Sequence, residues 1–309
     1  MKNLRTNTSL AKYTTLNIGG PARYFIEVTT ESELKESILY ALKNKIPYLV
    51  IGGGSNLLVN DKGFGGFVIR NLITGIKENK DRIYVKTGTT LSGLVNYTVS
   101  KGLFGMQKMV RIPGTVGGAI YGNSGSYGQA IGDYILKVKV FDGNKSFWLS
   151  KIQCCFGYRD SIFKKNNYFI IEVVFKFPKG HKKDLAKEFK ETLSIRIKKY
   201  PLNIKCPGSF FKNIEASTLT RGQLNTIPQD KIVYGKLPAG YLLEEVGANG
   251  MSLGEIKVAD YHGNLLLNQG GGKASDFFKL AKCLKEKVRH KFKIELEPEV
   301  QLVGFKNKL

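Results

Sequence analysis

The segment VIGGGSNLLV, residues 50–59, places three consecutive glycines directly after a short apolar run. Backbone that has no side chain can approach a phosphate closely, and unpaired amides in such a turn bind anions. The pattern is neither the GxGxxG of a Rossmann site nor a P-loop, because no GK[ST] follows. From this stretch alone, an ordinary tight turn is an equal alternative. The residues expected to contact a cofactor are Gly52, Gly53, Gly54, Ser55, Asn56 and Leu57.

A second segment, RIPGTVGGAIYGNSGSYG at residues 111–128, contains six glycines. Ordering so dense a loop loses much conformational entropy, which chains tolerate where backbone must lie flat against a ligand. Two such segments in one β-rich region suggest a long, phosphate-bearing cofactor held mainly by main chain. The residues expected to contact it here are Ile112, Pro113, Gly114, Thr115, Gly117, Gly118, Asn123 and Gly125.

Arg159 stands among aromatic residues in FGYRDSIFK, residues 156–164, where lysine would be the default cation of this chain. Arginine offers a planar, bidentate fork for a carboxylate. A structural salt bridge with Asp160 or another acid is the alternative, and it is the favoured one when this segment is taken in isolation.

Ser209 in CPGSFFKN, residues 206–213, sets a hydroxyl beside apolar bulk. No GxSxG surrounds it, which argues against hydrolase chemistry, but a hydroxyl in a dry pocket can donate a proton. Near the C-terminus, LEPEV places Glu297 and Glu299 on one face of a predicted strand that Pro298 bends. We expect one of the two glutamates to be structural.

The elements that position these residues begin with an α/β unit. Strands are predicted at 23–28 and 47–51, and between them Thr30 and Glu33 form the capping box of a helix. The apolar face of this helix is predicted to consist of Leu34, Ile38, Leu39 and Leu42.

The rest of the chain is mixed α+β in two main parts that divide near residues 180–200. Further strands are predicted at 66–71, 82–88, 135–141, 168–177 and 294–304. Helices are predicted at 90–103, just after Gly118, at 182–198, 239–247 and 275–292.

The composition is that of a globular protein, with 42% hydrophobic and 24% charged residues. Lys and Arg exceed Asp and Glu by 48 − 25 = 23. This charge suits either nucleic acid or phosphorylated small molecules. The lysines are scattered and form no arm or stripe, so a solvated surface accounts for most of them.

Four cysteines are present, at positions 154, 155, 206 and 283, and none forms a CxxC. We therefore expect reduced thiols and no metal. The N-terminus has no apolar h-region, and no apolar run approaches the ~20 residues of a membrane span. We expect a cytoplasmic protein without a membrane segment.

Taken together, the motifs resemble the UDP-N-acetylenolpyruvoylglucosamine reductase (UDP-N-acetylmuramate dehydrogenase) family. The similarity extends from NTSLAKYTTLNIGGPA at 7–22 to EPEVQLVG at 297–304. The motifs that establish it are GGGSN, IPGTVGGA, FGYRDSIFK, GSFFKN, PAGYLLEEVG and LEPEV.

The resemblance implies an FAD-binding fold of the vanillyl-alcohol oxidase type, made of two α/β subdomains, with a C-terminal α+β substrate domain. The implied FAD-binding domain spans 1–180, with subdomains of about 1–70 and 71–180. A connecting helix at 181–200 and a substrate-binding domain at 201–309 follow, and the final strand contributes to the active site.

The implied activity is the reduction of UDP-N-acetylglucosamine enolpyruvate to UDP-N-acetylmuramate in peptidoglycan precursor synthesis. NADPH is the co-substrate and FAD is held noncovalently, with hydride passing from flavin N5 to C3. By resemblance, Ser209 donates the proton to C2, and Arg159 and Glu299 stabilise the charge that develops. The substrate-binding residues implied in the same way are Tyr158, Lys199, Asn213 and His262.

The chain departs from the family pattern at several positions. Ile214 replaces a usual proline, Ser124 and Ser126 stand where alanine is common, and Gln107 and Arg111 replace a glutamate and a small residue. Arg111 directly precedes the second glycine-rich loop. The chain also lacks the insertion that carries a tyrosine over the site in longer members, which places it in the compact subgroup.

Two alternatives remain open. Another FAD-dependent oxidase on the same scaffold would often tether its flavin to His or Cys, but His181, His262 and His290 lie outside the glycine-rich loops. A nucleic-acid-binding protein would show clustered cations with aromatic platforms, which are not seen. We expect a monomer that binds NADPH and the UDP-sugar, and neither nucleic acid nor membrane.

Overall fold

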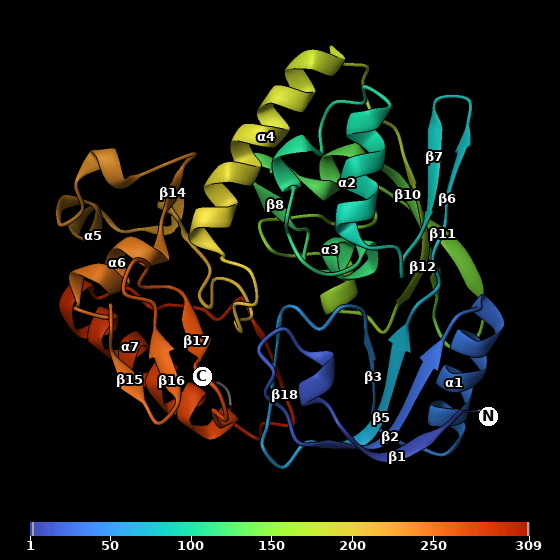
Figure 1. Ribbon diagram of the computed structural model, residues 1–309, viewed down its shortest axis with the longest axis horizontal. Coiled ribbons are helices and arrows are strands. Elements are labelled where there is room, and N and C mark those ends of the chain that lie inside the picture. The colour runs from blue at the N-terminus through green and yellow to red at the C-terminus, as the bar shows by residue number, and fades with distance from the viewer. Residues whose placement is uncertain (2, 308) are drawn as a thin grey trace. The chain divides into compact units, whose positions relative to one another are not determined.

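The computed structural model describes Met1, residues 3–307 and Leu309. It divides into two compact units, and Figure 1 labels their α-helices and most of their strands. Unit 1 comprises residues 1–7, 23–53 and 66–202, and unit 2 comprises residues 8–22, 54–65 and 203–309. The α+β class predicted from the sequence is confirmed by this mixture of elements.

The first sheet, most of which lies in unit 1, is formed by β1 (Arg5–Ser9), β2 (Pro21–Val28), β3 (Tyr48–Ile51) and β5 (Phe64–Asn71). Its order is β1-β2-β5-β3, and β3 runs parallel to β5. The strand β3 therefore delivers the first glycine-rich loop at its carboxyl end.

Helix α1 (Glu31–Lys43) covers this sheet, and its predicted capping box is confirmed. The hydroxyl of Thr30 accepts a hydrogen bond from the amide of Glu33, and the Glu33 carboxylate accepts one from the amide of Thr30, both at 3.2 Å. The predicted apolar face is partly wrong, because Leu39 and Leu42 are 45% and 41% exposed. Successive residues of a helix point about 100° apart, so only a narrow stripe of α1 can face the sheet. Ala41 lies on this stripe together with Leu34 and Ile38, and it is buried in place of Leu39 and Leu42.

The second sheet of unit 1 is antiparallel throughout, with the order β11-β10-β12-β7-β6. Its strands are β6 (Ile76–Asn79), β7 (Arg82–Lys86), β10 (Ile135–Phe141), β11 (Ser146–Ser150) and β12 (Phe169–Phe175). The helices α2 (Leu91–Ser100), α3 (Val116–Tyr121) and α4 (Lys182–Lys199) belong to the same unit, as do the short strands β8 (Gly125–Ser126) and β9 (Gln129–Ala130).

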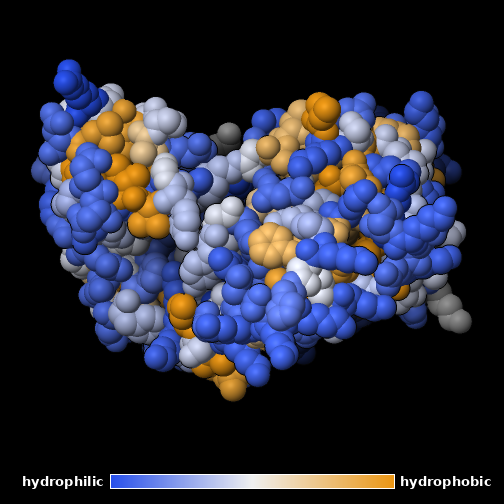
Figure 2. Space-filling view, turned by 90° about the horizontal axis from the view of Figure 1, so that it is seen from above, coloured by the Kyte–Doolittle hydropathy of each residue, from blue (hydrophilic) through white to orange (hydrophobic). Residues whose placement is uncertain are grey.

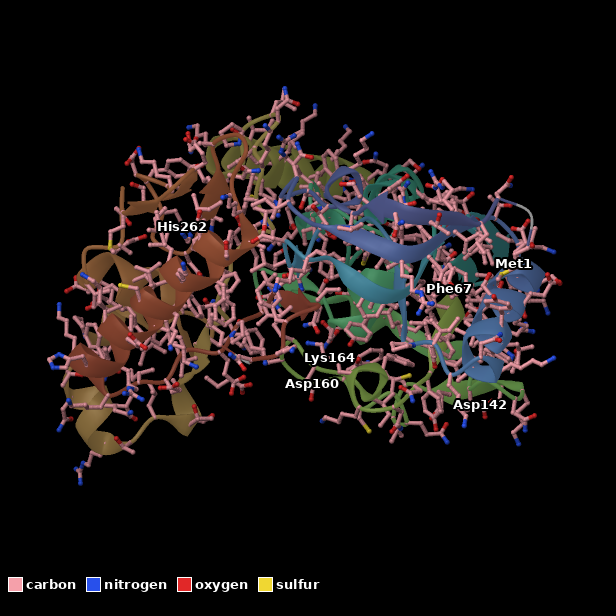
Figure 3. All side chains as sticks on the ribbon, turned by 90° about the horizontal axis from the view of Figure 1, so that it is seen from below. Met1, Phe67, Asp142, Asp160, Lys164 and His262 are labelled. Atoms are coloured by element: carbon pink, nitrogen blue, oxygen red, sulfur yellow. The ribbon has the colours of Figure 1, made fainter. Side chains whose placement is uncertain are left out.

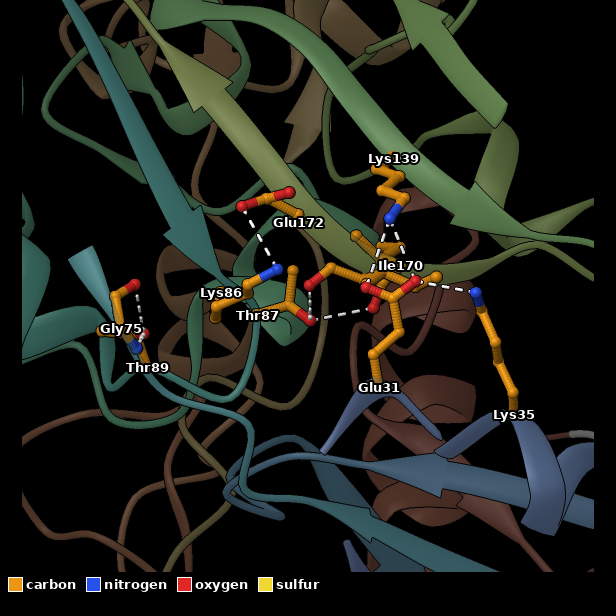
Figure 4. A network of polar contacts seen from close by, with 10 residues as sticks. Glu31, Lys35, Gly75, Lys86, Thr87, Thr89, Lys139, Ile170 and Glu172 are labelled. Carbon is orange, nitrogen blue, oxygen red and sulfur yellow. Dashed lines mark hydrogen bonds and ion pairs between the residues drawn. The ribbon is translucent and has the colours of Figure 1, made fainter. Parts of the chain in front are cut away.

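A network of ion pairs joins α1 to the second sheet (Figure 4). Glu31 pairs with Lys35 at 2.8 Å and with Lys139 of β10 at 3.0 Å. Burial alone would raise the pKa of Glu31, but hydrogen bonds from the two lysines outweigh it and lower the pKa. Lys86 and Glu172 form a further cross-strand pair at 3.3 Å.

Unit 2 is built around α7 (Ala274–Phe292), whose predicted apolar face of Phe277, Leu280, Leu284 and Val288 is buried. Its other helices are α5 (Arg221–Asn225) and α6 (Ala239–Glu245). Its strands are β4 (Leu57–Val59), β13 (Ile214–Glu215), β14 (Lys236–Leu237), β15 (Ser252–Leu253), β16 (Ile256–Val258), β17 (Leu266–Asn268) and β18 (Gln301–Val303).

The final strand is shorter than predicted. Only β18 forms a ladder, parallel to β4, whereas residues 294–300 lie outside any strand. Pro298 cannot donate a ladder hydrogen bond, and the chain makes a single isolated bridge between this residue and Phe211.

The predicted domain boundaries differ from the compact units at two places. The early segments 8–22 and 54–65 belong to unit 2, and α4 packs against α2 inside unit 1. The functional roles given to the domains remain predictions.

Hydrophilic residues dominate the face shown in Figure 2, and hydrophobic residues form scattered patches on it. Among the described helices, none combines the length and the apolarity that a membrane span requires.

Candidate functional site

The two glycine-rich loops meet in unit 1. A Cβ atom on Gly52 would collide with the side chain of Thr115, and one on Gly53 would lie 2.8 Å from Cα of Gly114. Real Cβ atoms essentially never approach that closely, so glycine at both positions is required by the contact between the loops. The segments predicted to bind one cofactor therefore lie against each other.

The first loop continues into unit 2 through Gly54, which has a φ of 61° and lies against the carbonyl of Tyr13. Within the described chain, the amides of Gly53 and Gly54 donate no hydrogen bond. Successive free amides in a turn form an anion-binding nest. This donor set fits the diphosphate of FAD.

The second loop is fixed by two carbonyls that follow β7. The amides of Val116 and Gly117 each donate at 2.8 Å, to the carbonyls of Thr89 and Thr87. A Cβ atom on Gly117 would lie 3.0 Å from that of Thr87, which explains the glycine. Thr115 caps α3 by accepting a hydrogen bond from the amide of Gly118.

Asn123 joins the second loop to the segment that contains Arg159. Its side-chain amide donates to the carbonyl of Gly157 at 2.8 Å, and its carbonyl accepts from the amide of Gly132 at 3.1 Å. The hydroxyl of Ser161 donates to the carbonyl of Tyr121 at 2.7 Å and forms a second link. The side chain of Asn123 thus positions one segment against the other.

Arg159 adopts a φ of 53°, in the left-handed region that is uncommon for residues other than glycine. Its Cζ lies 5.5 Å from the centroid of the Tyr158 ring, and its carbonyl accepts a hydrogen bond from Lys164 at 2.6 Å. Asp160, the acid considered as its partner, is paired with Lys165 at 2.8 Å. Figure 3 labels Asp160 and, on the short 3-10 helix that follows it, Lys164. Such strained backbone clusters at functional sites.

Arg196, which no sequence motif indicated, lies on the last turn of α4, three residues before Lys199. Burial lowers the pKa of the Arg196 guanidinium; Tyr200 and Tyr127 oppose the shift, whereas the charges of Arg111 and Arg159 add to it. The only available sequence signal was an arginine close to the predicted phosphate-binding lysine.

Ser209 and Glu299 lie on paired segments of unit 2. The amide of Glu299 donates to the carbonyl of Phe210 at 2.8 Å, and the amide of Lys212 donates to the carbonyl of Glu297 at 2.9 Å. Glu297 points to solvent and pairs with Lys212 at 3.0 Å. This ion pair leaves Glu299 as the candidate for chemistry.

The first glycine-rich loop also contacts the segment of Glu299. The side-chain amide of Asn56 donates to the carbonyl of Glu299 at 3.1 Å, and the carbonyl of Asn56 accepts from the amide of Gln301 at 2.9 Å. Leu57 pairs with Gln301 at the start of the β4–β18 ladder.

Asn264 holds the Ser209 segment from its other side. Its side chain exchanges two hydrogen bonds of 2.8 Å with the backbone of Phe211. The amide of Asn264 donates to Nδ1 of His262 at 3.1 Å. Asn213 accepts from the amide of Ala239 at 3.2 Å, so it borders the start of α6.

His262 also borders the start of α6, because a Cβ atom on Gly240 would lie 3.0 Å from Cε1 of its ring. The structure therefore brings Asn213 and His262 to one helix end in unit 2.

The predicted site residues are distributed over both units. Unit 1 contains Gly52, Gly53, Ile112, Pro113, Gly114, Thr115, Gly117, Gly118, Asn123, Gly125, Tyr158, Arg159 and Lys199. Unit 2 contains Gly54, Ser55, Asn56, Leu57, Ser209, Asn213, His262 and Glu299. Among the described residues, no group of three or more His, Cys, Asp or Glu side chains is placed to hold a metal ion.

Two family models match the chain. The model described as "FAD binding domain" matches residues 22–146, and the model described as "UDP-N-acetylenolpyruvoylglucosamine reductase, C-terminal domain" matches residues 200–303. The predicted FAD-binding fold is thereby confirmed.

Full-length relatives are similar to the chain. The UDP-N-acetylenolpyruvoylglucosamine reductase of Solibacter usitatus is 38% identical over 96% of both chains. That of Clostridium botulinum strain Okra is 34% identical over 99% of this chain and 94% of its own length. The crystal structure of the Thermus caldophilus UDP-N-acetylenolpyruvylglucosamine reductase superposes with a TM-score of 0.76 at 29% identity, covering 97% of this chain and 99% of its own.

Proposed function

Because the chain belongs to the UDP-N-acetylenolpyruvoylglucosamine reductase family, we propose that it reduces UDP-N-acetylglucosamine enolpyruvate to UDP-N-acetylmuramate with NADPH. The observation that carries this proposal is the similarity over the full length, from the first glycine-rich loop to β18. The product is a precursor of peptidoglycan.

FAD, when bound, supplies the hydride chemistry that links NADPH to C3 of the enolpyruvyl group. The proposed contacts are made by the two glycine-rich loops, whose main chain can approach the diphosphate closely. Gly53 and Gly54 offer amides that donate to no described residue, and Asn123 holds the second loop in place.

The chemical work of the protein falls to three side chains. Arg159 stabilises the negative charge that hydride addition moves toward the substrate carboxylate, through a bidentate fork. Ser209 delivers the proton to C2, which it can do because a strongly basic carbanion develops beside it. By the family resemblance, Glu299 acts with Arg159 to stabilise the charge that develops on the substrate.

The phosphates and nucleotide of the substrate are assigned to Tyr158, Lys199, Asn213 and His262. Lys199 supplies a cation, and Asn213 and His262 supply polar groups at the start of α6. We also propose that the protein is a monomer in the cytoplasm. Size-exclusion chromatography with light scattering tests the monomer, whose expected mass is 34.4 kDa.

An anaerobic experiment tests the proposed reaction. The purified flavoprotein is reduced with NADPH, the enolpyruvyl UDP-sugar is added, and flavin absorbance is followed. Reoxidation is expected with this substrate but not with UDP-N-acetylglucosamine, which lacks the enolpyruvyl group. A flavin that stays reduced after addition of the enolpyruvyl sugar contradicts the proposal.

A further inference from the structure

Three arginines gather in unit 1 beside the second glycine-rich loop. Arg111 precedes that loop, and its Nη2 donates to the carbonyl of Tyr200 at 2.8 Å. The Cζ of Arg196 lies 5.2 Å from the centroid of the Tyr200 ring. The charges of Arg111 and Arg159 both act to lower the pKa of Arg196. Arg111 and Arg196, which are far apart in sequence, therefore meet at Tyr200.

Among the residues that the structure describes, two of these cations have no acidic partner. Within the described part of the chain, neither Arg111 nor Arg196 pairs with a carboxylate, and the Nε of Arg196 is buried without a hydrogen-bond partner. Burying like charges together is unfavourable unless an opposite charge joins them. Two partly buried arginines without an acidic partner therefore favour the binding of an anion.

The backbone at Arg111 supports a role for its side chain. Its φ of 62° lies in the left-handed region, where an L-residue with a long side chain is strained. Glycine would fit this conformation better. The backbone conformation therefore does not explain why residue 111 is an arginine. A function of its guanidinium group does explain it.

We propose that Arg111 and Arg196 bind a phosphoryl group of a phosphorylated ligand of the enzyme, an inference that rests on the proposed function. The planar guanidinium fork matches phosphate oxygens bidentately. Arg196 shares its helical turn with Lys199, which is assigned to the substrate phosphates. The diphosphate of the UDP-sugar, the 2′-phosphate of NADPH and the diphosphate of FAD share this chemistry.

The test compares holoenzyme carrying Arg111→Gly with the wild type and with Lys108→Ala. The control removes one positive charge three residues away, from a lysine that already has an acid, Glu188, at 3.8 Å. Binding of UDP and of uridine is measured by calorimetry, the KM values of NADPH and NADH by turnover, and FAD retention by ultrafiltration.

We expect Arg111→Gly to weaken UDP binding about tenfold while uridine binding, FAD content and Tm stay unchanged. A loss confined to NADPH, with NADH unaffected, assigns the site to the 2′-phosphate. Release of FAD alone assigns it to the cofactor diphosphate. Arg196→Lys should reproduce the same selectivity with a smaller loss.

Unchanged affinity for every phosphorylated ligand overturns the proposal. Equal weakening of UDP and uridine together with a lowered Tm also overturns it, because Arg111 would then serve only to hold Tyr200. The wild-type protein is assayed in parallel for flavin reoxidation by the enolpyruvyl sugar. Failure of that assay counts against the proposed function, whereas a normal wild type with an unaffected variant counts only against the arginine site.

Discussion

Ser209 is positioned by its neighbours in sequence. Phe210 and Phe211 are fully buried, with ring centroids 4.9 Å apart, and Asn264 and Glu299 bind the backbone of the same segment. Removal of the Ser209 oxygen therefore leaves the packing of the segment in place. A variant at this position separates chemistry from folding.

We expect Ser209→Ala to retain FAD and to be reduced by NADPH at the wild-type rate. Reoxidation by the enolpyruvyl sugar should slow by roughly 10²–10⁴-fold, the usual contribution of a positioned acid. Stopped-flow absorbance separates the two half-reactions. Ser217→Ala, in an exposed turn of the same unit, is the matched control. Wild-type reoxidation by the Ser209 variant would remove this residue from the mechanism.

Gln107 explains one departure from the family pattern. It is fully buried, its Oε1 accepts from the amide of Gly105 at 2.8 Å, and its Nε2 donates to the carboxylate of Glu188 at 3.0 Å. A glutamate at this position would place two carboxylates within hydrogen-bond distance. Residue 107 is therefore a glutamine because its side-chain amide can donate a hydrogen bond to the Glu188 carboxylate.

We expect Gln107→Glu to lower the free energy of unfolding by on the order of 2 kcal/mol at neutral pH. Burial and the charge of Glu188 raise the folded-state pKa of the new carboxyl above its unfolded value of about 4.3. The penalty is therefore full above the folded pKa and is lost as pH falls through it. Urea unfolding from pH 8 to pH 5 checks this, with Gln107→Met as the pH-independent control. A penalty that grows toward acid would contradict the argument.

At the scale of elements, the N-terminus of α7 is capped from outside its own segment. The cap residue Lys273 makes no side-chain cap, but Asp61, just after β4, accepts from the amides of Ala274 and Ser275 at 2.7 and 2.9 Å. A carboxylate here satisfies two helix donors and complements the helix dipole. This contact fastens residues 54–65 to the core helix of unit 2.

Asp61→Ala should lower the free energy of unfolding by about 1–2 kcal/mol, the range for loss of a helix cap. Asp61→Asn retains one acceptor oxygen and should lose roughly half as much. Urea unfolding monitored by circular dichroism measures both. Equal stability of the alanine variant and the wild type would show that solvent replaces the cap at no cost.

The elements also show which features the sequence could predict. Local signals predicted the Thr30 capping box and the span of β10, because neighbouring residues determine them. The exposed Leu42 and the short final strand depend on the surface against which each segment packs. The Asp61 cap and the pairing of Phe211 with Pro298 join residues far apart in the chain, which periodicity does not reveal.

The candidate site likewise has features that the sequence predicts and features that it does not. The motifs predict the residue types of the site. They do not predict the contact between the loops at Gly53 and Gly114 or the position of Arg196. Both are products of tertiary packing rather than of local sequence.

For the whole molecule, the formal charge of +23 affects the rate at which charged ligands associate with the protein. Carboxylates such as Glu31 and Glu172 are occupied by lysines within unit 1, so paired residues contribute little net field. The remaining cations surround the protein with a positive potential. NADPH and the UDP-sugar are polyanions, and such a field raises their encounter rate.

We therefore expect kcat/KM for both substrates to fall several-fold as NaCl rises from about 0.02 to about 0.2 M, because the Debye length shortens across this range. The value of kcat should change little, since steering acts on encounter and not on the bound complex. Steady-state kinetics with NaCl, repeated with sucrose at matched viscosity, separates screening from slower diffusion. A kcat/KM that does not respond to salt would mean that the excess lysines serve solubility alone, and a fall in kcat of the same size would place the salt effect on the bound state.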